Sequence, residues 1–569
     1  MEKYMKYYVI GIGLFVWFSQ SIGLAQAAPF KKDEIKHDAE HYILLKEHSK
    51  RWASEDKNNA KRLAQLRKQN GGKRPNIIYI LIDDVGYGEF GIPELNYVRG
   101  YSTPSINKLA SESLSLARMY TEPSCTPTRT AFLTGRIPVR SHMLEPKVAP
   151  PEGSGLHKDE ITIAEVLSKA GYNTSHIGKW HQGDIENALP HNQGFDFAAF
   201  PMHNQATFNL MHEEAEKQGW ANAVSEEAEQ AEMAYTLDPG FRPRGWVLGL
   251  EAKKGEKAKE WGVKPGDPKN YSFEYYRNLN KHYQELAVSQ LRELAAQEEP
   301  FFLNYWGQNP IDFGRLDREF TQANGGAWVE SMKELDTWVG ELLDEVDRLG
   351  IAENTIVVLM GDNGTMEQAL GYTGFTDMIY RGFKAQSTEG GIRVPAFIRW
   401  PAAIKPGTYA GDIVHVTDLY TTFATIAGAD QHIPRDRIVD GVDQTTLFLE
   451  GDTKGRRDYI HMYDGPKYSK TIKQQFKVHW PGAGEPAFKL PVYDLYRDPR
   501  EERPLKVQGM WSVAYFGDMK ARHMAFKKHF PDRTEEEVSG VPYEGIEELR
   551  PETIELRERF FFAQELAGR

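Results

Sequence analysis

The sequence has almost no cysteine, because Cys125 is the only one among 569 residues. A single cysteine excludes an intrachain disulfide and a structural zinc site built from several cysteines. The chain also lacks an excess of basic over acidic residues. The formal net charge of −12 argues against a general binder of nucleic-acid phosphates. The hydrophobic content of 40% still suffices for a large core, so we expect a large globular domain with a smaller one.

Long apolar runs are missing too, apart from one near the N-terminus. Lys3 and Lys6 precede the apolar residues 9–18, and the small residues Ala25-Gln-Ala27 follow. This order is typical of a secretory signal peptide, so we expect cleavage near Ala27, export to the periplasm or the medium, and no stable membrane insertion. An uncleaved anchor is the alternative, although the run is short for a membrane span. In an oxidising compartment a lone thiol is buried, paired with another chain or chemically used.

The rest of the chain divides by composition. Residues 28–74 are polar and charge-rich, which predicts a helical extension on the surface and a linker that ends at Pro75. Residues 75–455 alternate apolar runs with amphipathic segments and form the predicted large domain. In residues 456–569 the apolar residues occur in short segments and alternate with polar ones, which predicts a smaller α+β domain with an antiparallel sheet and a helix.

The large domain is predicted to be α/β. Runs of apolar, mostly β-branched or aromatic residues predict strands that are buried on both faces, at 76–82, 301–306 and 355–360. Helical patterns lie between and after them, at 164–170, 328–349 and 416–427. Strands that alternate with helices predict a large, mixed and mostly parallel sheet sandwiched by helices.

Polar residues with oxygen ligands stand directly after the predicted strands. Asp83 and Asp84 follow the first strand, Gln308 follows the second, and Asp362 and Asn363 follow the third. Ligands bind at the carboxyl ends of the strands in such sheets, so we expect these residues on one rim. An oxygen-only site suits Ca²⁺ or Mg²⁺ rather than zinc. The alternative is that each aspartate is a helix N-cap or a turn residue.

The single cysteine lies at a predicted helix start. Pro127 fits the first turn of a helix, which places Cys125 where free backbone N–H groups favour anions. Arg129, about one turn later, can bind an oxyanion in a bidentate manner. The alternative is a small buried cysteine without a chemical role.

Three further residues could complete a reactive site. Lys179 and His181 alternate, so in an extended segment their side chains would point the same way. Lys384 precedes a glycine-containing segment that could turn it towards the rim. The alternatives are a solvated lysine beside a core histidine, and an ordinary surface lysine at position 384.

These segments together resemble the type I sulfatases. The stretch Cys125-Thr-Pro-Thr-Arg129 resembles their C-x-P-x-R signature, and their other landmarks follow in the family's order across residues 74–505. These are Asp83-Asp-Val-Gly-Tyr-Gly88, Gly178-Lys-Trp-His181, Gly194-Phe-Asp-Phe197, Gly361-Asp-Asn-Gly364, Glu389-Gly-Gly-Ile-Arg-Val-Pro395, Asp440-Gly-Val-Asp443 and Tyr493-Asp-Leu-Tyr-Arg-Asp-Pro499.

The resemblance implies that Cys125 is a precursor. In this family a dedicated formylglycine-generating enzyme oxidises the cysteine to an aldehyde during export. The resemblance also implies a Ca²⁺ site made by the modified Cys125 together with Asp83, Asp84, Asp362 and Asn363.

Catalytic roles follow from the same resemblance. Arg129 would help to hold a hydroxyl of the hydrated aldehyde as nucleophile, with Asp362 as proton acceptor. Lys384 would assist the leaving alcohol, and His181, oriented beside Lys179, would deprotonate the second hydroxyl to release sulfate. Clustered cations would stabilise the negative charge of the transferred group.

The sequence departs from the family pattern at three places. Where the family has a His-x-Pro-His pattern, this chain has Gln308-Asn-Pro-Ile311, so we predict that Gln308 and His203 contact the substrate; a structural role for His203 is the alternative. Glu89 stands where the opening motif has Asp. Gln182 replaces the usual Leu, and we expect little effect from that change.

The resemblance implies a calcium-dependent sulfatase acting on a sulfate ester, with a sulfated carbohydrate as the favoured substrate. Residues 204–272 form a polar insertion with Trp220, Trp246 and Trp261, which either stack on sugars or anchor the loop. Two other functions are open: a phosphonate or phosphate diester hydrolase of the same fold, and a non-catalytic protein that binds sulfated glycans. We expect no nucleic-acid partner.

Overall fold

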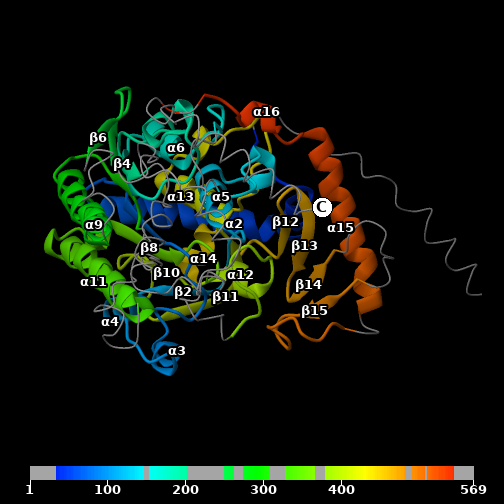
Figure 1. The fold of residues 1–569 in the computed structure, drawn as a ribbon. Coiled ribbons are helices and arrows are strands. Elements are labelled where there is room, and N and C mark those ends of the chain that lie inside the picture. The colour runs from blue at the N-terminus through cyan, green and yellow to red at the C-terminus, as the bar shows by residue number, and fades with distance from the viewer. Residues whose placement is uncertain are drawn as a thin grey trace, which may run out of the picture.

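The computed structural model describes residues 34–146, 153–201, 249–261, 273–307, 327–365, 379–480, 490–505, 509–541 and 543. The predicted signal peptide, and most of the predicted insertion at residues 204–272, lie outside the described residues. The described chain forms a large sheet with helices on both faces and a small sheet beside it (Figure 1).

The larger sheet is mixed, which confirms the predicted fold class. Among the described residues it has eleven strands in the order β11-β2-β10-β8-β1-β7-β3-β4-β5-β6, with β9 paired to β2. The central strands β8, β1, β7, β3 and β4 are parallel, whereas β10 and β5 run antiparallel to their neighbours. The strands span Asn76–Ile82 (β1), Leu114–Tyr120 (β2), Asn173–Gly178 (β3), Phe197–Pro201 (β4), Gly249–Lys253 (β5), Lys259–Trp261 (β6), Phe301–Trp306 (β7), Thr355–Gly361 (β8), Arg393–Val394 (β9), Ala396–Arg399 (β10) and Thr408–His415 (β11).

Strand β1 explains why helices cover both faces. All seven of its residues are buried. Its alternate side chains belong to two different apolar clusters, Ile77 to one and Ile78 to the other. Helices α5 (Cys125–Thr134), α6 (Ile163–Lys169) and α13 (Val416–Ala427) supply the first cluster, and α4 (Pro104–Ser111), α9 (Phe273–Ala295) and α11 (Ala327–Arg348) supply the second.

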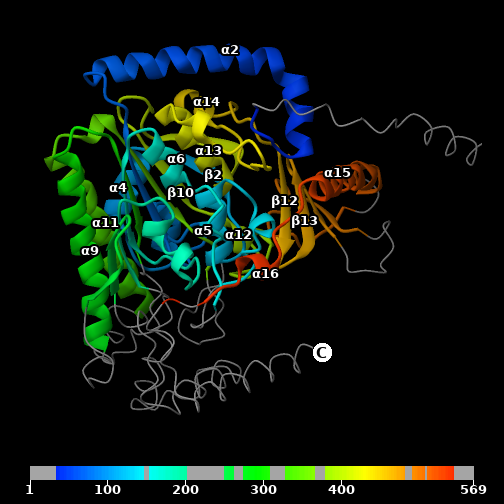
Figure 2. The ribbon, with the colours of Figure 1, turned by 90° about the horizontal axis from the view of Figure 1, so that it is seen from above.

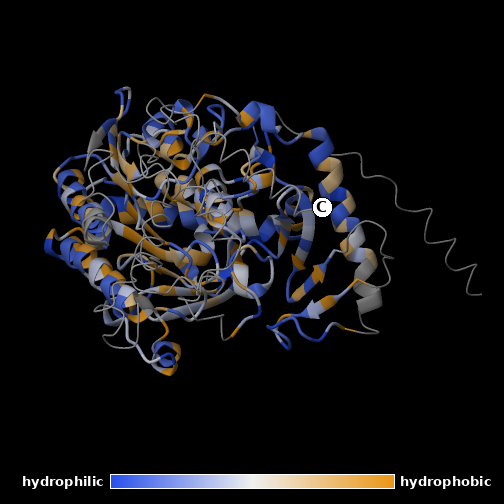
Figure 3. Cartoon of the chain, viewed as in Figure 1, coloured by the Kyte–Doolittle hydropathy of each residue, from blue (hydrophilic) through white to orange (hydrophobic). Residues whose placement is uncertain are grey.

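The pictures agree with this layering. Helices α9 and α11 lie side by side along one side of the molecule (Figure 2). The strands between the helical layers are largely hydrophobic, whereas the outer helices alternate hydrophilic and hydrophobic positions (Figure 3). Short helices fill the connections: α3 (Pro93–Val98), α12 (Glu389–Ile392), α14 (Thr445–Glu450) and α16 (Glu535–Val538), with 3-10 turns at Pro138–Ser141, Glu186–Ala188, Pro190–Asn192, Ala352–Asn354 and Asp430–His432.

The smaller sheet is antiparallel and comes from the C-terminal part of the chain. It contains β12 (Tyr459–Asp464), β13 (Lys467–Lys473), β14 (Phe476–His479) and β15 (Val492–Asp494) in sequence order. Helix α15 (Gly509–His529) packs on it, because Phe516 and Met519 share an apolar cluster with Val478 and Val492. An antiparallel sheet with one helix matches the secondary structure predicted for this region.

The long helix α2 (Ala39–Gln69) spans both parts of the molecule (Figure 2). Near its start, Leu44 and Trp52 pack in the cluster of the smaller sheet. Near its end, Leu63 and Leu66 belong to the core of the larger sheet. The helix predicted at the start of the chain therefore connects the two sheets by apolar packing.

Candidate active site

The carboxyl ends of β1 and β8 bring together the residues predicted on the rim. The two strands are paired in parallel from Asn76 with Thr355 to Ile82 with Gly361. Because the register is continuous, Asp83 and Asp362 come next to each other directly after the strands. The Asp362 N–H donates to the Ile82 carbonyl at 2.9 Å, which extends the pairing by one step.

Asp83 lies at the centre of a buried ion-pair cluster. Lys179 Nζ donates to both of its carboxylate oxygens, at 2.7 and 2.9 Å. Arg129 Nη2 donates to Asp83 Oδ1 at 3.2 Å. Burial alone would raise the pKa of Asp83, but Lys179 and Arg129 outweigh it and hold that pKa well below its usual range. Asp83 is therefore ionised throughout the neutral range.

Asp84 points its carboxylate towards three other groups. Its backbone has φ of 55°, a left-handed conformation uncommon for a residue with a Cβ atom. Its Oδ2 accepts from Lys384 Nζ at 2.7 Å, and its Oδ1 accepts from Asn363 Nδ2 at 2.7 Å. The Cys125 Sγ atom lies 3.7 Å from Asp84 Oδ1. The sharp turn at Asp84 thus directs its side chain to the cysteine and to Lys384.

Asp362, which directly follows β8, completes the cluster. Its Oδ1 accepts the Asp84 N–H at 2.9 Å, and its Oδ2 accepts Arg129 Nη2 at 2.9 Å. Burial and the neighbouring charge of Asp83 raise the pKa of Asp362 to about 7. Of the two carboxyl groups, Asp362 is therefore the one that takes up a proton more readily.

Cys125 is the first residue of α5, as the sequence predicted. Every residue of α5 is buried, and Ser124 precedes it in an extended conformation. Burial raises the pKa of the Cys125 thiol to about 12. At pH 7 a thiol with that pKa is ionised in roughly one molecule in 10⁵, so the unmodified thiol is a poor nucleophile.

Arg129 is fixed by the residues that surround it. Its guanidinium group lies over the Trp306 ring at 4.7 Å and is bound to two aspartates. Its Nη1 also donates to the Lys179 carbonyl at 3.3 Å. The side chain is fully buried, so Arg129 carries a fixed positive charge at the base of the site.

The segment after β3 carries Lys179 and His181, and it differs from the extended conformation that we expected. His181 has φ of 58°, so the chain turns at this residue. Lys179 reaches Asp83, and the His181 carbonyl accepts from Thr126 Oγ1 at 2.9 Å. Both side chains are buried. Lys179 thus enters the site by its side chain, and the turn at His181 packs its backbone against α5.

Gln182 links this turn to α5. Its Nε2 donates to the His181 carbonyl at 2.8 Å, and its Oε1 accepts from Thr130 Oγ1 at 2.6 Å. The side chain is fully buried, so these bonds are shielded from water. We expected the change from Leu to have little effect; in the structure this residue holds the His181 turn against the cysteine helix.

Glu89, the other departure from the pattern, also has a defined place. Its Oε2 accepts the Gly86 N–H at 2.7 Å, and its Oε1 accepts from Arg99 at 3.3 Å. Its backbone carbonyl accepts from Asn96 at 2.8 Å. Glu89 therefore stabilises the loop that follows Asp83 and Asp84.

Lys384 reaches the site because its loop packs closely on α12. A Cβ atom at Gly391 would collide with the carbonyl oxygens of Phe383 and Gln386, so only glycine permits this approach. Burial would lower the pKa of Lys384, but Asp84 and the other acidic groups of the site raise it well above the ordinary lysine value. Lys384 is therefore protonated, and its side chain remains 14% exposed.

A buried network behind this loop was missed by sequence reasoning. Lys477, on β14, donates to Glu389 and to Glu501 at 3.1 Å each. Glu501 also accepts the Glu389 N–H at 2.7 Å, and all three side chains are fully buried. Glu389 begins α12, so the smaller sheet holds the segment that positions Lys384. The three residues are widely separated in sequence, and no local pattern connects them.

Four groups at the site could together ligate a cation. One ligand atom each of Asp83, Asp84, Asp362 and Cys125 lies within 4.8 Å of the others. Asn363 Oδ1 is also buried there, and it has no hydrogen-bond partner among the described residues. The predicted substrate-binding residues His203 and Gln308 lie outside the described residues.

Comparison with known proteins identifies the family. A family model described as sulfatase matches residues 75–429. The chain belongs to the sulfatase family. This sulfatase is 30% identical to the steryl-sulfatase of Rattus norvegicus over 510 residues, with 76% of this chain and 85% of the relative covered. It is 28% identical to the N-acetylgalactosamine-6-sulfatase of Mus musculus over 425 residues, with 71% and 72% covered.

A solved structure shows the same fold. The PsFucS1 sulfatase from Pseudoalteromonas sp. superimposes with a TM-score of 0.72 at 26% identity, covering 84% of this chain and 96% of that chain. The family, its relatives and the clustered site agree that this sulfatase is a hydrolase of sulfate esters. In the described part of the chain, no helix combines the length and apolar character needed to cross a membrane.

The Lys477 network generates a testable prediction. Lys477→Met removes the lysine that two buried carboxylates share and leaves Glu389 with Arg393 and Glu501 with His479, which should reduce the free energy of unfolding by about 3 kcal/mol. Because α12 positions Lys384, we also expect kcat to fall roughly ten- to hundredfold. Thermal unfolding and steady-state kinetics measure both effects.

Lys467→Met is the matched control, since Lys467 is exposed on β13 of the same sheet. Its stability should stay within about 0.5 kcal/mol of the parent protein. Equal stability and activity of Lys477→Met and Lys467→Met would show that the network does not position the Lys384 loop.

Proposed function

We propose that this sulfatase hydrolyses its ester through a formylglycine made from Cys125, assisted by Ca²⁺. The observation that carries the proposal is the position of Cys125 beside three carboxylates and three cations at one rim of the sheet. In that setting a thiol with a raised pKa is a poor nucleophile, and an aldehyde at the same place would need no ionisation of sulfur.

Burial of Cys125 also bears on its modification. Its side chain has no exposed surface in the folded chain. A maturation enzyme that reads the C-x-P-x-R segment must therefore act before α5 packs into the core. A formylglycine-generating enzyme is accordingly the proposed partner during export.

The residues present fit a calcium ion. Asp83, Asp84, Asp362 and Asn363 offer oxygen atoms only, the donor set that Ca²⁺ prefers. Asn363 Oδ1 has no hydrogen-bond partner among the described residues and can serve as a ligand. The charges of three aspartates are already balanced by Arg129, Lys179 and Lys384, so a divalent cation gives the site a surplus positive charge for a sulfate ester.

The protein's own side chains supply orientation and proton transfer. When bound, Ca²⁺ polarises the sulfate oxygens, and formylglycine supplies the nucleophilic hydroxyl of its hydrated aldehyde. Arg129 is held by Trp306 and two aspartates, and it stabilises negative charge at the base of the site. Asp362, which a bound cation would keep ionised, would accept the proton of the attacking hydroxyl on a carboxylate oxygen.

Lys384 acts when the alcohol leaves, and His181 acts when sulfate is released. Lys384 is protonated and retains partial exposure, so its Nζ can donate to the oxygen of the departing alcohol. His181, which the Thr126 and Gln182 bonds hold in place, takes up a proton on an imidazole nitrogen during sulfate release. Lys179 orients Asp83 beneath them.

A sulfated carbohydrate is the proposed substrate. The mouse relative at 28% identity is named for a sulfated amino sugar, which supports this class, whereas the rat relative is named for a steryl sulfate. We propose that His203 and Gln308 contact the sugar side of the ester, in place of the family's missing histidine pair. The tryptophans of the insertion at residues 204–272 are the proposed surface for selecting the sugar.

Export is part of the proposal. The basic, apolar and small-residue order of residues 3–27 supports a secretory signal peptide. Proteins that carry such a segment leave the cytoplasm, and we assign this sulfatase to the periplasm or the medium. N-terminal sequencing of the mature protein tests this assignment, because an intact Met1 would contradict it.

The function is tested with a matched substrate panel. N-Acetylgalactosamine 6-sulfate, a steryl sulfate, nitrophenyl sulfate and a phenylphosphonate monoester are offered to the protein and to Cys125→Ala. We expect sulfate release to be fastest from the sugar sulfate, and Cys125→Ala to lose at least about 10³-fold in kcat, because the nucleophile is gone.

Each other result changes the conclusion. Faster turnover of the steryl sulfate would overturn the carbohydrate assignment. Faster turnover of the phosphonate would move the function to that ester class. Sulfate release by Cys125→Ala at the parent rate would contradict the proposed nucleophile.

The calcium site has a separate test. Asp84→Asn keeps the side-chain size but removes a charge from the proposed ligand set, and it should weaken Ca²⁺ binding at least about tenfold. Calorimetric titration of metal-free protein with Ca²⁺ measures the affinity. The control is Asp452→Asn, an exposed residue whose Oδ1 accepts the Gly411 N–H. Equal Ca²⁺ affinity of the two variants would contradict the site.

A further inference from the structure

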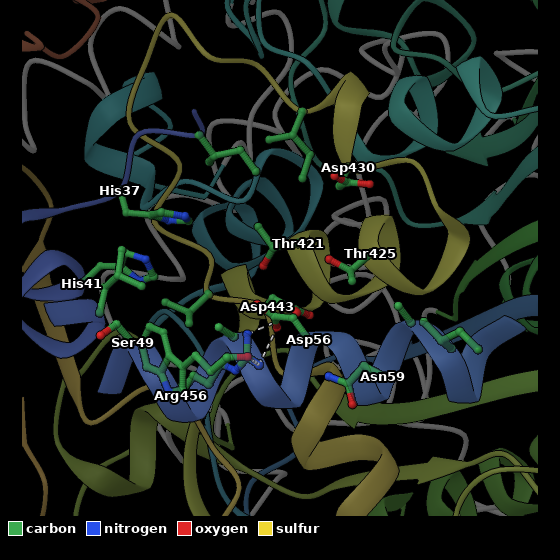
Figure 4. A pocket seen from close by; sticks show the side chains of 18 of the residues that line it. His37, His41, Ser49, Asp56, Asn59, Thr421, Thr425, Asp430, Asp443 and Arg456 are labelled. Atoms are coloured by element: carbon green, nitrogen blue, oxygen red, sulfur yellow. Dashed lines mark hydrogen bonds and ion pairs between the residues drawn. The ribbon is translucent and has the colours of Figure 1, made fainter. Parts of the chain in front are cut away.

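A hollow lies between α2 and the large domain, and none of its lining residues belongs to the active site (Figure 4). We call it the α2 groove. It is formed by one face of α2, by α13, and by the segments on either side of α14. Its cavity volume of about 620 Å³ lies within the range of small-ligand sites. Its characteristic residues are His41, Trp52, Ala60, Thr421, Asp443 and Arg456.

Small residues of α2 leave the groove open. Ser49, Ala53, Ala60 and Ala64 lie on the groove face at helical spacing, and all four are exposed. Residues that also line the groove, such as Leu63, are buried behind them. The result is a groove with a buried floor and a solvent-open rim, shaped for an extended ligand.

Buried polar atoms in the lining have no hydrogen-bond partner among the described residues. These atoms are Nδ1 of His41, Nε1 of Trp52 and Nε of Arg456, on side chains that are 9%, 4% and 7% exposed. Each unsatisfied group of this kind costs about 1–3 kcal/mol. The rings of His37 and His41 project from the same side towards the hollow (Figure 4). These atoms lie just beneath the groove surface, and exposed polar side chains such as Ser49 and Asp56 stand above them, so the lining is polar as well as apolar.

The charges of the lining disfavour an anion. Asp56, Asp430 and Asp443 stand against the guanidinium groups of Arg67 and Arg456. Arg456 is already bound to Asp56 at 2.6 Å. Burial lowers the pKa of His37 to about 4 and holds that of His41 well below its usual range, so both imidazoles are neutral. The groove therefore has no surplus positive charge for a sulfate or phosphate group.

We propose that the α2 groove binds an uncharged stretch of a carbohydrate chain. Sugar hydroxyls both donate and accept, which suits a lining that mixes donors and acceptors, such as Ser49, Asp56 and Arg456. The apolar faces of sugar rings can pack on the alanines of α2 and on the exposed Leu45. The proposal adds a second carbohydrate site remote in sequence from the catalytic motifs, and it does not depend on the proposed chemistry at Cys125.

The test fills the groove from its open rim. Ala60→Trp places a bulky side chain in the groove at an exposed helix position, so the fold should tolerate it. Asn58→Trp is the matched control, because Asn58 is exposed on α2 and does not line the groove. Calorimetry measures binding of neutral hexasaccharides of glucose, galactose, fucose and N-acetylgalactosamine to the three proteins, and nitrophenyl sulfate hydrolysis reports on the active site.

We expect the parent protein and Asn58→Trp to bind at least one of these hexasaccharides alike, and Ala60→Trp to bind it at least tenfold more weakly. Nitrophenyl sulfate turnover should be the same in all three proteins. Three results would overturn the proposal: no hexasaccharide binds, Ala60→Trp binds as the parent does, or only sulfated hexasaccharides bind. A failure of nitrophenyl sulfate turnover would count against the catalytic proposal alone, because binding is measured separately.

Discussion

The ion pairs centred on Asp83 are the constraint on which the active site depends. Three carboxylates and three cations lie at one rim, nearly all without contact with water. A buried charge is tolerated only when partners compensate its lost hydration. Each partner comes from a different element, so the site exists only when the strand ends, α5 and the Lys384 loop meet.

The parallel register of β1 and β8 satisfies this constraint. It places Asp83 beside Asp362, one residue beyond the last paired positions. The turn after β3 then brings Lys179 to Asp83, and the first turn of α5 brings Arg129. The smaller sheet contributes at a distance, because Lys477 fixes Glu389 and with it the segment next to Lys384. Stability and catalysis therefore share the same buried charges.

Much of the fold could be predicted from sequence. The strands 76–82 and 301–306 and the helix 416–427 have the predicted bounds, since continuous apolar runs end at Gly, Pro or Asp. The order of the strands and the antiparallel β10 could not be predicted, because pairing depends on contacts between distant segments. The bridging role of α2 was also missed, since its apolar residues are spread over both ends of a polar helix.

The residues of the active site could be predicted from the sequence where they belong to a recognisable motif. The resemblance brought Cys125, Arg129, Lys179 and Lys384 together, and the structure places them within one cluster. The turn at His181 could not be foreseen, because alternation of Lys179 and His181 does not reveal a left-handed residue. Gln182 and Lys477 act through hydrogen bonds to groups that no local pattern marks, so only the three-dimensional structure reveals them.

The mass of the tryptic peptide that carries Cys125, measured on protein purified from its native host, decides whether a formylglycine is the nucleophile. We predict a mass that fits an aldehyde in place of the thiol, since the unmodified thiol is buried and poorly ionised. A peptide that carries only unmodified cysteine would contradict the formylglycine mechanism, because that mechanism would then have no nucleophile.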